Sequence, residues 1–144
     1  MALAGAAGFA DGSGAAARFN IPTGIAVDGS GNLFVGDMNN NKIRKVTPAG
    51  DVTTLALSAF IYWPRGLAFN PAGTLFVAAD QGHAVYAIDT TTGNATLLLG
   101  TPDLEGAFPG AFPAGLSRPM GLAFTPQGDL LITTANGLML ATAP

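Results

Sequence analysis

Short apolar stretches recur along the chain, separated by turns rich in glycine, proline and asparagine. Gly24–Asp28 and Leu33–Gly36 are the first two stretches, and the glycines between them are typical of a tight hairpin turn. The Asn-rich segment Asp37–Asn41 follows and suits positive φ angles. Lys42–Val46 alternates polar and apolar residues, which predicts a half-exposed strand. Asp51–Leu57 lies beyond another turn and predicts a fourth strand.

This pattern is an internal repeat, because proline, glycine, alanine, glycine and leucine recur at matching positions of three segments. The segments align without gaps and are Pro22–Gly36, Pro64–Ala78 and Pro119–Thr133. We expect a single domain, residues 1–144, with repeat one at 22–57, repeat two at 64–100 and repeat three at 119–143. The segment 2–5 is similar to the ends of the fourth strands and is predicted to be an orphan outer strand.

Burial is predicted to change from the first strand of each repeat to the last. The first two strands are apolar throughout, as in strands buried on both faces, whereas the third and fourth carry the charges. Four antiparallel strands that are buried at one edge and solvated at the other are typical of a propeller blade. The predicted fold class is all-β, a β-propeller with blades of four antiparallel strands and three blades per chain.

The first repeat resembles the NHL repeat. The segments that carry the resemblance are Pro22–Asp28, Gly31–Asp37 and Asn41–Gly50, with the lead-in Gly8–Pro22. The resemblance is weakest in the third repeat, where Thr134–Asn136 replaces the Asp-rich turn. It implies a β-propeller, commonly six-bladed, that binds ligands on one face of the disc. The family includes binding modules and some enzymes, so the resemblance does not name a ligand.

The strand count predicts an assembly. One orphan strand followed by four, four and three strands corresponds to three blades, or half of a six-bladed disc. A homodimer in which each chain donates its N-terminal strand to the other's C-terminal blade would close the ring by strand exchange. Closure of this kind covers two apolar blade faces and an unpaired strand edge. A piece of a longer natural chain is the alternative.

Composition fits this expectation and excludes several partners. Hydrophobic residues make up 49% of the 144 residues and charged residues 10%, against roughly 25% charged residues in an ordinary globular domain. The net charge is -3 and the basic residues are mostly scattered, which excludes a nucleic-acid partner. No apolar run has the length of a membrane helix, which argues against a membrane partner. The absence of cysteine excludes disulfides, a thiol nucleophile and a Cys-ligated zinc site.

The compartment stays open. The N-terminal residues lack the basic region of a secretory signal, so we expect no signal peptide in this chain. The resemblance implies a family that is often bacterial and secreted or attached to the cell envelope.

The carboxylates are predicted to be structural. Asp28 and Asp37 could bind a metal or form an acid/base pair, but Asp at strand ends usually caps turns through its own side chain. Thr125 and Thr134 replace them in the third repeat, which favours turn capping. Asp11 and Arg18 are expected to clamp the first long loop together. We predict no catalytic residue, no metal site and no cofactor.

The ligand face is predicted where the loops between blades meet the turns. The long connections Ala6–Ile21 and Thr101–Arg118 should share one face of the propeller, and loops on a rigid scaffold are where binding usually resides. Trp63 and Tyr62 are the aromatic candidates for contact with a sugar or a peptide. His83, the single histidine, is expected to be a solvated loop residue.

The three arginines near the aligned prolines are expected to ring the central channel. Phe9, Phe19, Phe108 and Phe112 are instead expected, at least in part, to plug gaps between blades. The candidate ligand-binding residues are Arg18, Asp37, Asn39, Asn40, Trp63, Arg65, His83 and Arg118.

The predicted function is therefore a non-enzymatic propeller scaffold or binding module, with itself as partner and a peptide, carbohydrate or other small molecule as ligand. The alternative is an NHL-type lyase or hydrolase with a metal in the central channel. An enzyme of that kind needs several inward His, Glu or Asp residues from different blades, and this chain has one His and one Glu, Glu105.

Overall fold

A computed structural model describes residues 6–102 and 116–142 of the chain, and these residues fold into strands with two single turns of 3-10 helix. The predicted orphan strand 2–5 lies outside the described residues, as do Glu105, Phe108 and Phe112. No helix in the described part of the chain is long and apolar enough to cross a membrane.

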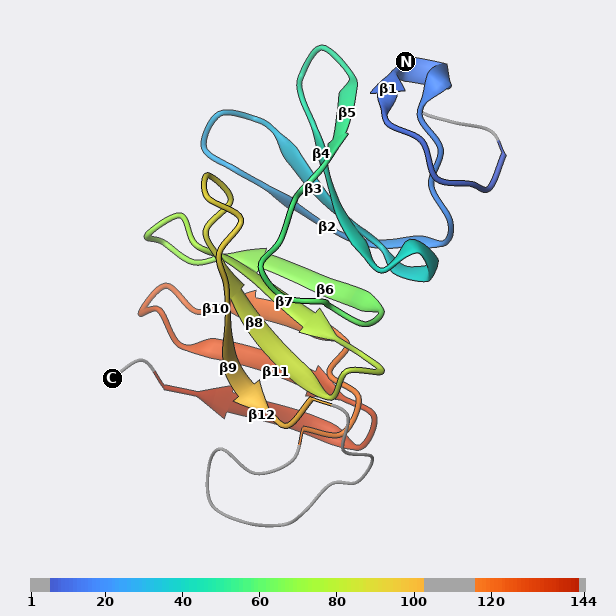
Figure 1. The fold of residues 1–144 in the computed structure, drawn as a ribbon. Coiled ribbons are helices and arrows are strands. Elements are labelled where there is room, and N and C mark those ends of the chain that lie inside the picture. The colour runs from blue at the N-terminus through green and yellow to red at the C-terminus, as the bar shows by residue number, and fades with distance from the viewer. Residues whose placement is uncertain (1–5, 103–115, 143–144) are drawn as a thin grey trace.

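The strands form three antiparallel sheets that follow one another in sequence, as the chain colour in Figure 1 shows. In the first sheet the order is β1-β5-β4-β3-β2. Its strands are β1 (Gly12–Ser13), β2 (Pro22–Val27), β3 (Leu33–Asp37), β4 (Lys42–Val46) and β5 (Asp51–Thr54). The 3-10 turns are η1 (Gly14–Ala16) and η2 (Met38–Asn40). The all-β prediction is confirmed, and the three sheets are the expected propeller-like blades.

The second and third sheets repeat this meander. The second has the order β6-β7-β8-β9, with β6 (Pro64–Phe69), β7 (Leu75–Ala79), β8 (Ala84–Ile88) and β9 (Ala95–Gly100). The third has the order β10-β11-β12, with β10 (Gly121–Phe124), β11 (Leu130–Thr134) and β12 (Gly137–Ala141). The innermost strands are β2, β6 and β10, and β6 packs between β2 and β10.

The first sheet has one strand that the sequence did not predict. β1 comes from the connection expected to be a loop, and its Gly12 pairs with Val52 on the outer edge of the sheet. The N-terminal segment thus folds back over the outside of its own blade, beside β5 (Figure 1). β4 has the predicted bounds, whereas β5 ends at Thr54 rather than at Leu57.

The repeated glycine of each inner strand permits the close approach of neighbouring blades. A Cβ on Gly24 would lie 2.2 Å from the carbonyl oxygen of Arg65, and one on Gly66 would lie 2.3 Å from that of Met120. Because real Cβ atoms do not come this close to backbone oxygens, only glycine fits at these two positions.

The hydrophobic core lies between the sheets. One cluster of buried residues joins the first and second blades and includes Phe34, Ile43, Leu67 and Ile88. A second joins the second and third blades and includes Val85, Leu130 and Ile132. Phe34 packs edge-on to Phe69 with ring centroids 5.3 Å apart. Burial between blades accounts for the apolar composition of the chain.

Candidate functional site

A shallow depression, largely open to solvent, lies between the three inner strands β2, β6 and β10, and we call it the hollow. It has a volume of about 410 Å³ and is lined by the first half of each inner strand, residues Thr23, Gly24, Ile25, Arg65, Gly66, Leu67, Met120, Gly121 and Leu122. Most of these side chains are apolar or absent, and Arg65 supplies the one charge. The exposed surface of the hollow is polar and apolar in similar measure, because apolar side chains lie beside Thr23, Arg65 and three glycines.

A residue with left-handed backbone precedes each inner strand. These residues are Ile21 at φ 52°, Trp63 at φ 53° and Arg118 at φ 48°, and each stands before an aligned proline. Positive φ is uncommon for residues other than glycine and is most unusual for a β-branched residue such as Ile21. The same backbone geometry therefore recurs before the inner strand of each repeat with a different side chain each time.

Hydrogen bonds from the preceding blade hold the backbone of two of these residues, Trp63 and Arg118. The Oδ1 of Asn41 accepts a hydrogen bond from the backbone N–H of Trp63 at 2.9 Å. The Nδ1 of His83 accepts one from the backbone N–H of Arg118 at 3.3 Å. Asn41 and His83 are themselves equivalent in the repeat, at φ 53° and 48°. We call this end of the inner strands, with residues 21, 63 and 118, Asn41 and the turn 80–83, the mouth.

His83 corrects an expectation. It was predicted to be a solvated loop residue, but it is only 7% exposed and acts as a hydrogen-bond acceptor between two blades. The positive φ predicted for the Asn-rich turn is confirmed at Asn41.

Asp80 binds two arginines at the mouth. Its Oδ2 accepts a hydrogen bond from Nη1 of Arg65 at 2.9 Å, and its Oδ1 accepts one from Nε of Arg118, also at 2.9 Å. Nη2 of Arg118 makes a longer bond of 3.3 Å to Oδ2. The Asp80 side chain is 1% exposed, whereas those of Arg65 and Arg118 are 40% and 44% exposed. We call these three residues the Asp80 cluster.

The charge of Asp80 is stabilised by its partners. Burial alone would raise the pKa of Asp80, but the hydrogen bonds and charges of Arg118 and Arg65 outweigh it and lower the pKa below 3.8. The pKa of Arg118 is raised by its hydrogen bond to Asp80 and by the charge of that carboxylate. The cluster is therefore one anion held by two permanent cations.

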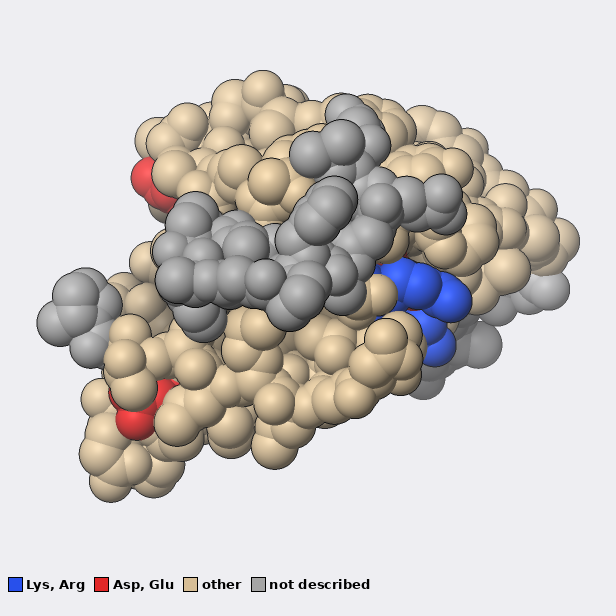
Figure 2. Space-filling view, turned by 90° about the horizontal axis from the view of Figure 1, so that it is seen from below, with Lys and Arg blue, Asp and Glu red and all other residues tan. Residues whose placement is uncertain are grey.

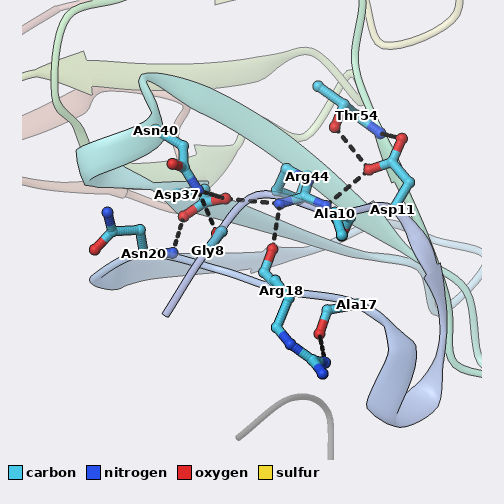
Figure 3. A network of polar contacts seen from close by, with 10 residues as sticks. All are labelled: Gly8, Ala10, Asp11, Ala17, Arg18, Asn20, Asp37, Asn40, Arg44 and Thr54. Carbon is cyan, nitrogen blue, oxygen red and sulfur yellow. Dashed lines mark hydrogen bonds and ion pairs between the residues drawn. The ribbon is translucent and has the colours of Figure 1, made fainter. Parts of the chain in front are cut away.

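A second group of ion pairs lies around Arg44 in the first blade (Figure 3). Its Nη1 donates to Asp37 Oδ2 and its Nη2 to Asp11 Oδ1, both at 2.7 Å. The carbonyl oxygens of Arg18 and Ala10 accept further bonds from the same guanidinium. We call this group the Arg44 cluster.

Arg44 is fully buried, because the N-terminal segment covers it. Its guanidinium carbon lies 5.0 Å from the centre of the Phe9 ring and 4.8 Å from that of Phe19. The prediction that β4 is half exposed is thus wrong at Arg44, which is 0% exposed. Phe9 and Phe19 cover this cation rather than a gap between blades.

The predicted clamp between Asp11 and Arg18 is also wrong. Asp11 binds Arg44 and the N–H and hydroxyl of Thr54, whereas the side chain of Arg18 donates to the carbonyl oxygens of Ala15 and Ala17. Burial would raise the pKa of Asp11, but hydrogen bonds from Thr54 and Arg44 lower it. Asp11 therefore does hold the first long loop in place, but through Arg44 and Thr54 rather than through Arg18.

The turn carboxylates are structural, as predicted. Asp28 accepts hydrogen bonds from the N–H groups of Ser30 and Asn32 and from the Asn32 side chain, and these bonds lower its pKa. Asp28 and Asp37 lie at opposite ends of β3, since Val27 pairs with Leu33 and Pro22 pairs with Asp37. Among residues 6–102 and 116–142, no group of three His, Cys, Asp or Glu could hold a metal ion.

The structure divides the predicted ligand residues into two sets. Trp63, Arg65, His83 and Arg118 lie together at the mouth. Asp37, Asn40 and the backbone of Arg18 belong to the Arg44 cluster (Figure 3). The side chain of Asn39 donates a hydrogen bond to that of Asn20.

Sequence reasoning missed two residues. Asp80 was not a candidate, although it stands in the same short turn as His83. Phe60, 66% exposed, was also missed; it stacks on Tyr62 with ring centroids 6.2 Å apart. The run of aromatic residues before Pro64 was the available signal.

The comparisons with known proteins agree with this architecture. The NHL repeat pattern matches residues 19–46. Protein SUPPRESSOR OF QUENCHING 1, chloroplastic, from Arabidopsis thaliana is 31% identical over 112 residues, which are 69% of this chain and 10% of that protein.

Solved structures of similar fold include enzymes. Virginiamycin B lyase from Staphylococcus aureus, crystallised with Quinupristin, has a TM-score of 0.66 at 21% identity over 87% of this chain and 41% of that one. A gluconolactonase from Xanthomonas campestris has a TM-score of 0.63 at 21% identity over 78% of this chain and 34% of that one. The chain thus spans a tenth of the curated relative and less than half of these solved chains.

These neighbours overturn one prediction. The sequence predicted a non-enzymatic protein. That prediction is contradicted, because enzymes are among the solved structures of similar fold. A lyase, a gluconolactonase and a luciferin-regenerating enzyme all share this architecture at 18–21% identity.

Proposed function

We propose that this chain, an NHL-repeat β-propeller segment, binds a small organic molecule at the mouth and in the hollow between β2, β6 and β10. The recurrence of a left-handed residue before each inner strand carries the proposal. Ile21, Trp63 and Arg118 offer an apolar, an aromatic and a cationic group around one axis, so that a single molecule at the axis could contact all three. The backbone at each position is fixed by hydrogen bonds, as a preformed site requires.

The size and lining of the hollow support a ligand of this kind. About 410 Å³ lies in the range of small-molecule sites. Ile25, Leu67 and Leu122 provide apolar surface, while Thr23 and Arg65 provide polar groups. The lyase of similar fold was crystallised with the small molecule Quinupristin.

A second copy of the chain is proposed to complete a six-bladed ring, with β10 of one copy beside β2 of the other. Gly121 supports this, since it aligns with Gly24 and Gly66. Those two glycines accommodate the backbone of the next inner strand, whereas the three described atoms nearest to a Cβ on Gly121 all belong to the Thr133 side chain. The side chain of Val27 on β2 is 55% exposed, and association would bury it.

Light scattering after size-exclusion chromatography tests this closure. We expect twice the 14.4 kDa chain mass for the wild type. Gly121→Val should release monomers, while Gly137→Ala, where an added Cβ meets no atom within 4 Å, should stay dimeric. A wild-type mass of one chain would contradict the proposed closure.

Ligand binding is tested by NMR chemical-shift mapping with a fragment library. We expect the shifts to gather on the Trp63 indole and on the amides of Thr23, Gly66 and Leu122. Trp63→Leu should weaken the hits, and Leu138→Ala, on the exposed outer strand β12, should not. Hits that map only away from the hollow would contradict the proposal.

Catalysis is the second candidate, favoured by the enzymes of similar fold. The proposed reaction is that of an NHL-type lyase or hydrolase, but the residues that line the hollow include no His, Asp or Glu and so do not fit a metal there. Turnover of quinupristin or gluconolactone, assayed with and without added divalent metal, tests it. Activity that disappears in Arg118→Gln would support catalysis at the mouth, and no turnover of either compound would count against it.

A further inference from the structure

The Asp80 cluster carries more positive than negative charge. Two guanidinium groups face one carboxylate, so the cluster has a net charge of +1. The printed sequence has only 6 Lys and Arg in 144 residues, and two of these converge here. Figure 2 shows a face on which the visible basic atoms form one group in a largely uncharged surface, with the acidic atoms lying apart from it.

The surplus charge is accessible to a ligand. The carboxylate of Asp80 is 1% exposed, but the arginine side chains that bind it are 40% and 44% exposed. A guanidinium has five N–H donors. Arg65 uses one nitrogen and Arg118 two in bonds to Asp80, so most of their donors have no partner among the described residues.

Both guanidiniums are held in place before a ligand arrives. Asp80 bridges them, and its own N–H donates to the carbonyl oxygen of Trp63 at 3.0 Å. The backbone of Arg118 is fixed by His83 at one side and by Pro119 at the other. Side chains that are already ordered lose less entropy on binding.

The apolar surface next to the cluster defines the rest of the ligand. Arg65 belongs to the cluster and also lines the axial hollow, whose walls include Leu67, Met120 and Leu122. A charged group on the arginines therefore leads directly to apolar surface between the inner strands.

We infer that Arg65 and Arg118, held by Asp80, bind the carboxylate of a small organic acid whose apolar part lies in the hollow. One negative charge matches the surplus of +1, whereas a phosphate dianion would exceed it. Arginine pairs with carboxylates through parallel N–H donors, which fixes the orientation of the acid. This inference rests on the proposed function and adds the chemical class of the ligand.

The test uses hexanoate and its neutral amide, hexanamide, titrated into the full chain and followed by NMR at constant ionic strength. We expect hexanoate to shift the side-chain signals of Arg65 and Arg118 and to bind at least about tenfold more tightly than hexanamide, as removal of a charge-assisted hydrogen bond implies. Arg65→Gln and Arg118→Gln should each weaken hexanoate by about tenfold and leave hexanamide unchanged. Lys45→Gln removes the same charge from β4, away from the mouth, and should change neither.

The outcomes separate the two proposals. Equal binding of hexanoate and hexanamide at the hollow would overturn the carboxylate site and leave the ligand-binding function standing. Binding of hexanoate that does not weaken in either arginine variant would also overturn the site. Failure of both probes and of the fragment library to shift any mouth or hollow residue would overturn the proposed function itself.

Discussion

The Arg44 cluster and the Asp80 cluster use the same residue types in opposite proportions. In the first, one buried cation binds two carboxylates, under a lid of Phe9 and Phe19. In the second, one buried carboxylate binds two cations that reach solvent. Charge that is enclosed can only stabilise the fold, whereas charge that is anchored but exposed remains available to a ligand. This difference makes the first cluster the one expected to matter for stability and the second the one proposed to bind a ligand.

The largest expected effect is on the Arg44 cluster. Arg44→Ala should lower the free energy of unfolding by about 3–5 kcal/mol, because it leaves the buried Asp37 without its cation. Urea unfolding followed by circular dichroism measures this. Lys45→Ala, on the same strand, is the control and should cost less than about 1 kcal/mol. A decrease in unfolding free energy for Arg44→Ala as small as that of Lys45→Ala would show that the Arg44 cluster does not stabilise the fold.

Asp80→Asn should have a smaller effect, about 1–3 kcal/mol, since it removes charge-assisted hydrogen bonds from partners that remain solvated. The same denaturation experiment measures it. Two effects on binding oppose each other, because the net charge of the cluster rises while the carboxylate that orders both guanidiniums is lost, so hexanoate binding should change by less than about tenfold. A variant that loses both stability and binding would show that the placement of the two guanidiniums, rather than the net charge of the cluster, determines the affinity for hexanoate.

The contribution of Asp80 should depend on pH. Its pKa in the folded protein is lowered below 3.8 by its two arginines, so its stabilisation is complete above about that pH and decreases as the pH falls through the folded pKa. The difference in unfolding free energy between the wild type and Asp80→Asn should therefore be constant from neutral pH down to about 4 and shrink below it. A difference that shrinks already between neutral pH and 5 would contradict the assigned ion pairs.

The smallest expected effect on stability is that of the two mouth arginines. Arg65→Gln should cost about 0–1 kcal/mol, because its side chain is 40% exposed and Asp80 keeps its bonds to Arg118, and Arg118→Gln should have a similarly small effect on the melting temperature. Thermal unfolding measures this. Weak effects on stability together with strong effects on hexanoate binding would support different roles for the two clusters. A loss of stability equal to that of Arg44→Ala would show that both clusters stabilise the fold.

The repeat pattern was sufficient to predict the blades, because each repeat carries the same turn glycines and inner-strand glycine. β4 was predicted to the residue since its alternation is a local property. The burial of Arg44 could not be predicted in that way, as a polar residue on an alternating strand normally faces water. Residues 8–19, distant in sequence, determine its burial by folding back over β4 and β5.

The candidate site was predicted only in part, because some of its residues stand at repeated positions of the sequence and others meet only through packing between blades. Arg65 and Arg118 were found because they stand beside aligned prolines, a feature of the sequence itself. The carboxylate that joins them was missed, because Asp80 meets Arg118 only through the packing of one blade on the next. His83 was misjudged because its partner is the backbone N–H of another repeat, which no side-chain pattern reveals.

The left-handed residues before the inner strands have a consequence for how such proteins diversify. Isoleucine, tryptophan and arginine all adopt this strained conformation here, at roughly 1–2 kcal/mol each, so the surrounding hydrogen bonds rather than the side chain hold it. The side chain at this position can therefore be exchanged without changes to the strands of the blade that carries it. Substitutions at residues 21, 63 and 118 alone would generate a family of specificities on one unchanged frame.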